Sequence, residues 1–75
     1  MEQKVLEALV RVNEEIASFD GDNLFDAGLL DSFQVIELVG ELEDTFDIDI
    51  DAKYVVEENF SSKDAIIALI KSLME

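Results

Sequence analysis

The chain contains no cysteine, histidine, proline or tryptophan. Without cysteine it has neither a disulfide nor a thiolate metal ligand, so its stability must come from packing and from local helix signals. Without histidine or cysteine it also lacks the usual pairs of nucleophile and base, which argues against catalysis by the chain itself. We therefore predict that the protein is not an enzyme.

Basic residues are scarce as well, with five Lys and Arg against 19 Asp and Glu and a formal net charge of −14. This balance argues against nucleic acid as a partner, because binding nucleic acid depends on Lys and Arg that displace counterions from phosphates. A basic protein surface is the natural partner. The chain also lacks a long apolar run and an N-terminal signal pattern. We expect no membrane insertion, a cytoplasmic location and a monomer.

Leu, Ile, Val and Phe account for 28 of the 75 residues. This share lies well above the roughly 20 % below which a highly charged chain stays disordered. At this length we expect residues 1–75 to form one domain, with room for a helical bundle and not for an enclosed active site.

Apolar residues recur at helical spacing from Glu2 to about Ala17, which predicts the first helix. The turn formers of residues 18–23 end it. The loop that follows, up to Asp31, is not purely polar. Five of its apolar side chains are expected to fold back on the bundle and pin the loop: Phe19, Leu24, Phe25, Leu29 and Leu30.

A second helix is predicted to start at Asp31, because its carboxylate can cap the helix and Gln34 stands three residues on. Its expected apolar stripe consists of Phe33, Ile36, Val39, Leu42 and Phe46, with Val35 and Leu38 beside it. Gly40 in mid-helix costs roughly 1 kcal/mol relative to alanine. Either a neighbour approaches this glycine closely or the helix tolerates the loss.

A short third helix is predicted from Ala52 to about Asn59. The segment from Ser61 to Asp64 resembles a capping box, and the last helix follows through Leu73. The predicted fold is therefore all-α, a small bundle of three main helices plus one short helix.

The segment from Asp47 to Glu58 offers a rival function, that of an EF-hand-like calcium binder. Asp47, Asp49 and Asp51 alternate with apolar residues, and Glu58 holds the twelfth position of such a loop. Against this reading, the sixth position needs glycine for a sharp turn and here holds Ala52.

The segment 28–33 ends the loop and opens the second helix. As a structural residue, Ser32 would cap or begin the helix. As a functional residue, its hydroxyl stands at the positive end of a helix, where a phosphate is held favourably. It has no neighbouring base, so it would be a substrate of another enzyme.

The carboxylates of Glu37, Glu41 and Asp44 form either a solvated face or a negative surface for a partner. A plain acidic interaction module is therefore a third possible function, beside a modified serine and a calcium binder.

The order and spacing of the predicted helices, the loop and the serine segment resemble those of an acyl carrier protein over nearly the whole length of the chain. The resemblance rests on residues 24–33 (LFDAGLLDSF), on Ile36-Glu37-Leu38 and Leu42-Glu43, and on Phe46-Asp47-Ile48. It implies that a phosphopantetheinyl transferase, using coenzyme A and magnesium, attaches a 4′-phosphopantetheine arm to Ser32. The thiol of the arm would then carry acyl or aminoacyl groups as thioesters.

The resemblance also implies roles for other residues. Asp31 would cap the second helix and help to present Ser32. Glu37, Glu41 and Asp44 would meet basic patches on an acyl- or aminoacyl-loading ligase and on a downstream transferase or synthase, because electrostatic steering suits a shuttle. Long cargo would enter a candidate acyl pocket made of residues that equally form an ordinary core: Leu38, Leu42, Phe46, Ile50 and Phe60.

The kind of cargo stays open. The serine segment is similar to D-alanyl carrier proteins and to stand-alone carriers of aminoacyl or specialised acyl groups. Carriers of fatty acid biosynthesis more often have leucine where Phe33 stands and a bulky residue near Gly40. D-alanyl carriers are expected to have tryptophan and proline between the third and fourth helices, and residues 57–64 contain neither.

Overall fold

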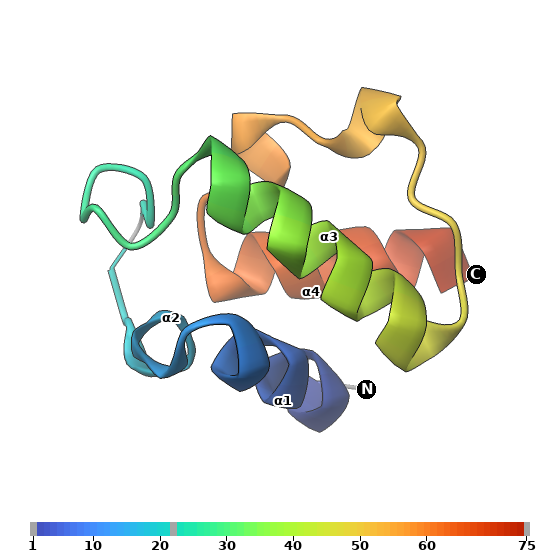
Figure 1. Cartoon of the computed structure of the whole chain (residues 1–75), viewed down its shortest axis with the longest axis horizontal. Helices are drawn as coiled ribbons and strands as arrows, with labels where there is room; N and C mark the ends of the chain where they lie inside the picture. The colour runs from blue at the N-terminus through green and yellow to red at the C-terminus, as the bar shows by residue number, and fades with distance from the viewer. Residues whose placement is uncertain (1, 22, 75) are drawn as a thin grey trace.

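The computed structural model describes residues 2–21 and 23–74. Its α-helices are α1 (Glu2–Val12), α2 (Glu14–Ser18), α3 (Ser32–Phe46) and α4 (Lys63–Met74), and two 3-10 turns, η1 (Ala52–Tyr54) and η2 (Glu57–Asn59), lie between α3 and α4. Helix α1 packs against α2, α3 and α4, and η2 packs against α4 (Figure 1). The predicted all-α bundle with three main helices is confirmed. In the described part of the chain, no helix is both long and apolar enough to cross a membrane.

The first predicted helix is interrupted at Asn13. The backbone of Asn13 is extended, with φ −164° and ψ 113°, and its side-chain oxygen accepts a hydrogen bond of 3.0 Å from the backbone N–H of Glu15. Asn13 therefore ends α1 and caps α2, a role for which asparagine is well suited. The prediction of one continuous helix was wrong, although Ile16 of α2 is still buried in the core.

The predicted short third helix is also wrong, because the chain forms two separate 3-10 turns there. Asp51 caps η1 by accepting a hydrogen bond of 3.1 Å from the backbone N–H of Lys53. The adjacent β-branched residues Val55 and Val56, which disfavour a helix, lie between the turns. The side-chain amide of Asn59 donates to the carbonyl of Tyr54 at 2.9 Å and joins η2 to η1. The short helix of the bundle is therefore α2.

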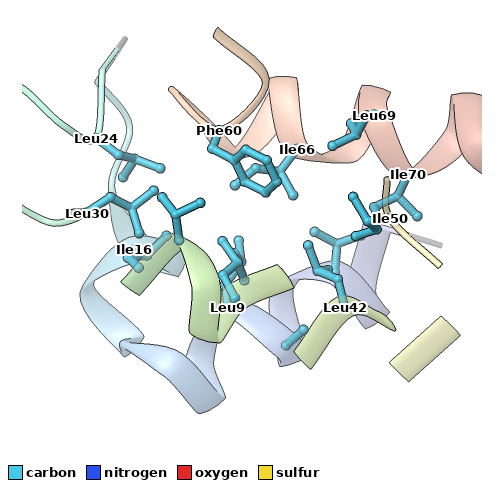
Figure 2. Packing of buried hydrophobic residues seen from close by; sticks show 14 residues of the cluster. Leu9, Ile16, Leu24, Leu30, Leu42, Ile50, Phe60, Ile66, Leu69 and Ile70 are labelled. Atoms are coloured by element: carbon cyan, nitrogen blue, oxygen red, sulfur yellow. The ribbon is translucent and has the colours of Figure 1, made fainter. Parts of the chain in front are cut away.

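The core takes side chains from all four α-helices and from the connecting segments. Figure 2 shows Leu24 and Leu30 of the long loop on the same side of the core as Ile16. Phe19, Phe25 and Leu29 are partly buried against this core, which confirms the predicted pinning of the loop. The buried set is Val5, Ala8, Leu9, Ile16, Leu24, Leu30, Val35, Leu38, Leu42, Ile50, Phe60, Ile66, Leu69 and Ile70.

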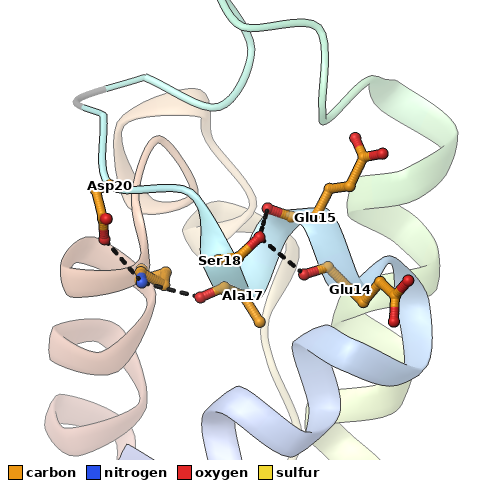
Figure 3. A network of polar contacts seen from close by, with 6 residues as sticks. Glu14, Glu15, Ala17, Ser18 and Asp20 are labelled. Carbon is orange, nitrogen blue, oxygen red and sulfur yellow. Dashed lines mark hydrogen bonds and ion pairs between the residues drawn. The ribbon is translucent and has the colours of Figure 1, made fainter.

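Polar contacts fix the loop to the start of α4. The ammonium group of Lys63 donates to the carbonyl of Ala17 at 2.9 Å and lies 3.5 Å from the carboxylate of Asp20 (Figure 3). The backbone N–H of Leu24 donates to the carbonyl of Ser61 at 2.6 Å. These contacts hold both the beginning and the middle of the loop, so that it delivers the chain to the start of α3 in a defined position.

The start of α4 is capped one residue later than the predicted box implies. The hydroxyl of Ser62 accepts a hydrogen bond of 3.1 Å from the backbone N–H of Ala65. Ser62, and not Ser61, is therefore the residue whose side chain satisfies one of the free N–H groups at the start of this helix.

Candidate functional site

Asp31 caps α3, as predicted. Its backbone is extended, with φ −136° and ψ −177°, and its Oδ1 accepts a hydrogen bond of 2.9 Å from the backbone N–H of Gln34. Its carbonyl accepts a further bond from Val35 at 2.9 Å. Because Asp31 performs the capping, Ser32 becomes the first residue of the helix and its hydroxyl is not used as a cap. Of the two structural roles predicted for Ser32, capping the helix or beginning it, the structure shows the second.

Ser32 is exposed and lines a surface hollow of about 480 Å³. The hollow lies between the long loop, the first turns of α3 and the segment that joins the two 3-10 turns. Its other lining residues are Phe25, Val35, Ile36, Val55, Val56 and Glu57. Within residues 2–21 and 23–74, no hydrogen bond to the Ser32 hydroxyl is formed. The serine thus offers an accessible oxygen beside a mainly apolar surface.

The predicted apolar stripe of α3 is wrong for the first turns of the helix, where two of its residues point to the surface. Phe33 is 78 % exposed and Ile36 is 67 % exposed, whereas the buried residues of this helix are Val35, Leu38 and Leu42. Both sets recur at helical spacing, and packing against the rest of the bundle decides which of them turns inward. Two large apolar side chains next to Ser32 are consequently left on the surface.

The three predicted partner-binding carboxylates do not share one environment. Glu37 and Asp44 are exposed. Glu41 accepts a hydrogen bond of 2.7 Å from Nε of Arg11, and the same guanidinium donates to Oγ1 of Thr45 at 2.7 Å. Glu41 therefore links α3 to α1, while Glu37 and Asp44 remain the more accessible carboxylates.

The candidate acyl pocket is occupied by core packing. Leu38, Leu42 and Phe60 are fully buried, Ile50 is nearly so, and Phe46 is partly buried against them. None of these five residues lines the hollow beside Ser32. The sequence reasoning missed Phe25, Val55 and Val56 as neighbours of the serine. The sequence held only a weak indication of this arrangement. Two adjacent β-branched residues disfavour a helix, which argued against the short third helix that was predicted to contain Val55 and Val56.

The segment from Asp47 to Glu58 ends α3 and forms two 3-10 turns, an arrangement that differs from a calcium loop. Asp47 ends α3 in the left-handed conformation, the carboxylate of Asp51 is used to cap η1, and Glu58 lies within η2. In the described part of the chain, no three acidic side chains are grouped so as to hold a metal ion. The geometry therefore gives no support to the EF-hand alternative.

Comparison with known proteins identifies the chain. The family described as "Phosphopantetheine attachment site" matches residues 3–70. The chain belongs to the acyl carrier protein family. This carrier protein is 32 % identical over 74 residues to the D-alanyl carrier protein of Streptococcus uberis, covering 97 % of this chain and 94 % of that protein. It is 34 % identical over 61 residues to the D-alanyl carrier protein of Streptococcus suis, with 81 % and 77 % covered. No solved structure gives a significant match.

Family membership establishes the cofactor and the general function. The protein is a carrier that holds acyl or aminoacyl groups on a covalently attached 4′-phosphopantetheine. The residues present fit this group, because an exposed hydroxyl at the start of α3 adjoins an apolar hollow and the sequence has no sulfhydryl of its own. A specific role in fatty acid biosynthesis gains no support, since these relatives are named as D-alanyl carriers.

Proposed function

We propose that Ser32 is the attachment residue and that the carrier moves cargo between enzymes without catalysing a reaction itself. The observation that carries this proposal is the exposed Ser32 hydroxyl at the first position of α3, left free because Asp31 provides the cap. A phosphodiester at this point lies at the positive end of the helix dipole, which is favourable.

The modification itself requires a phosphopantetheinyl transferase with coenzyme A and magnesium. The bond between Oγ and phosphorus forms as the pyrophosphate bond of coenzyme A breaks, and adenosine 3′,5′-bisphosphate leaves. Because no histidine or cysteine occurs in the chain, we assign the removal of the hydroxyl proton to the transferase.

Intact-mass measurement after incubation with the transferase, coenzyme A and magnesium tests the proposal. Wild type should gain the mass of one phosphopantetheine and Ser32→Ala should gain none. Ser72→Ala, which removes an exposed hydroxyl from α4, should be modified like wild type. An adduct on Ser32→Ala would refute the assignment.

The partners proposed beyond the transferase are a ligase that loads the arm and a downstream transferase or synthase, each with a basic docking patch. The net charge of −14 and the exposed carboxylates of Glu37 and Asp44 support this choice of partner surface. The cytoplasmic location predicted from the sequence stays a prediction.

Within the general class of acyl and aminoacyl cargo, we propose D-alanine or another aminoacyl group. The names of the two relatives, both D-alanyl carrier proteins, favour this choice. Such a small group needs no enclosed pocket. We predict that loading with alanine leaves the NMR signals of Leu38, Leu42, Phe46, Ile50 and Phe60 unshifted. A long acyl chain that enters the core would shift them, whereas one that lies in the hollow would shift Phe25, Val55 and Val56 instead. Core shifts on loading with alanine would contradict this prediction.

A further inference from the structure

Asp20 and Gly21 form an exposed pair in the loop between α2 and α3. The side chain of Asp20 is 94 % exposed, and its carboxylate lies 3.5 Å from the ammonium group of Lys63. An ion pair this exposed restrains a side chain only weakly. In the part of the chain that the structure describes, the N–H of Gly21 donates no hydrogen bond. The carboxyl carbon of Asp20 and the peptide nitrogen that follows it are therefore both free to move.

The packing of the loop requires the glycine of this pair. A Cβ built on Gly21 would overlap the ring of Phe19, which packs against the core. A Cβ built on Gly40, by contrast, meets no atom within 4 Å, so α3 tolerates that glycine without needing it. A larger residue at position 21 would displace the Phe19 ring. The fold thus keeps a glycine directly after an exposed aspartate.

Aspartate precedes a small residue at four other places in the sequence, and in each of these pairs one of the two groups is held. The N–H groups of Ala27 and Ala65 each donate a hydrogen bond of 3.1 Å. The carboxylates of Asp31 and Asp51 each accept a capping hydrogen bond, of 2.9 Å and 3.1 Å. The four pairs are Asp26-Ala27, Asp31-Ser32, Asp51-Ala52 and Asp64-Ala65.

We propose that Asp20 is a site of spontaneous isoaspartate formation in the folded protein. The peptide nitrogen of Gly21 attacks the protonated side-chain carboxyl group of Asp20. A C–N bond forms, and the carboxyl hydroxyl leaves as water with the proton of the nitrogen, which gives a cyclic imide. Water then adds to one imide carbonyl and breaks its C–N bond. Hydrolysis at the side-chain carbonyl restores aspartate, whereas hydrolysis at the main-chain carbonyl leaves isoaspartate.

The reaction would lengthen the main chain between two fixed points. The carbonyl of Ala17 accepts a hydrogen bond of 2.9 Å from Lys63, and the N–H of Leu24 donates to the carbonyl of Ser61 at 2.6 Å. In isoaspartate the main chain passes through the side-chain carbon and gains one carbon atom. Because both ends of the loop are held, the added length falls on its exposed part. We expect the helices to persist, so the inference does not depend on the proposed function.

The experiment compares the folded protein with the protein unfolded in urea, each incubated in mildly acidic water enriched in oxygen-18. Every hydrolysis of the imide incorporates one heavy oxygen, and fragmentation of proteolytic peptides locates both the label and the isoaspartate. Folding should slow labelling of Asp20 less than fivefold, because neither reacting group is held in the native loop. It should slow labelling of the other four aspartates at least tenfold.

Two variants serve as matched tests of the site. Asp20→Glu keeps the charge near Lys63 but needs a larger ring, so label and isoaspartate should disappear from position 20. Asp26→Glu makes the same change in the same loop and should leave the labelling of Asp20 unchanged. Circular dichroism verifies that both variants keep their helices. Fivefold or greater slowing of Asp20 on folding would refute the inference, as would a second aspartate that reacts equally fast in the folded protein.

Discussion

Asp47 shows how one residue ends α3 at a cost in stability. It has φ 54°, and its backbone N–H and that of Ile48 both bond to the carbonyl of Glu43. This left-handed position is usually held by glycine and is tolerated by asparagine and aspartate. The carboxylate also lies at the negative end of the helix dipole, where an anion is unfavourable.

We predict that Asp47→Asn stabilises the carrier protein by about 0.3–1 kcal/mol, because asparagine keeps the left-handed conformation and removes the unfavourable charge. Urea denaturation followed by circular dichroism measures the change. Asp26→Asn is the matched control, since it removes the same charge from an exposed loop position. Equal stabilisation of both variants would show that only the net charge matters.

At the scale of single elements, the sequence was most informative where the interaction is local. The cap of α3 was predictable because Asp31 and Gln34 are three residues apart and their hydrogen bond depends on little else. The start of α2 also had a local signal, because Asn13 is a favoured capping residue and two glutamates follow it directly. The apolar spacing that continues to Ile16 concealed the break between α1 and α2.

The orientation of α3 depends on the rest of the bundle and was therefore not predictable from spacing. Phe33 and Ile36 have the same periodicity as Val35 and Leu38, and only packing against α1 and the core distinguishes the two sets. The hollow beside Ser32 is beyond sequence reasoning for the same reason. It joins Phe25 to residues about thirty positions later in the chain.

At the scale of the whole molecule, electrostatic repulsion opposes folding. The net charge of −14 is carried by a small bundle, and the exposed ion pair between Arg11 and Glu41 offsets little of it. Screening by salt weakens repulsion between exposed charges more than about 10 Å apart at 0.1 M ionic strength.

We therefore predict that the melting temperature rises by several degrees when sodium chloride is increased from about 0.05 M to about 0.5 M, where the screening length falls well below the width of the bundle. Thermal unfolding followed by circular dichroism measures the change. Tetramethylammonium chloride at equal ionic strength is the control for specific sodium binding. A melting temperature that falls with salt would show that attractive pairs dominate the balance.

Asp31 caps α3, whereas Ser32 is the proposed attachment residue, so two different residues carry the structural and the functional role at this helix start. Since the cap of α3 does not use the serine hydroxyl, gaining or losing a group on that oxygen leaves the hydrogen bonds of the helix start unchanged. We therefore expect the unmodified, modified and loaded forms to share the same start of α3. Successive enzymes would then distinguish these forms by the group that is attached to Ser32.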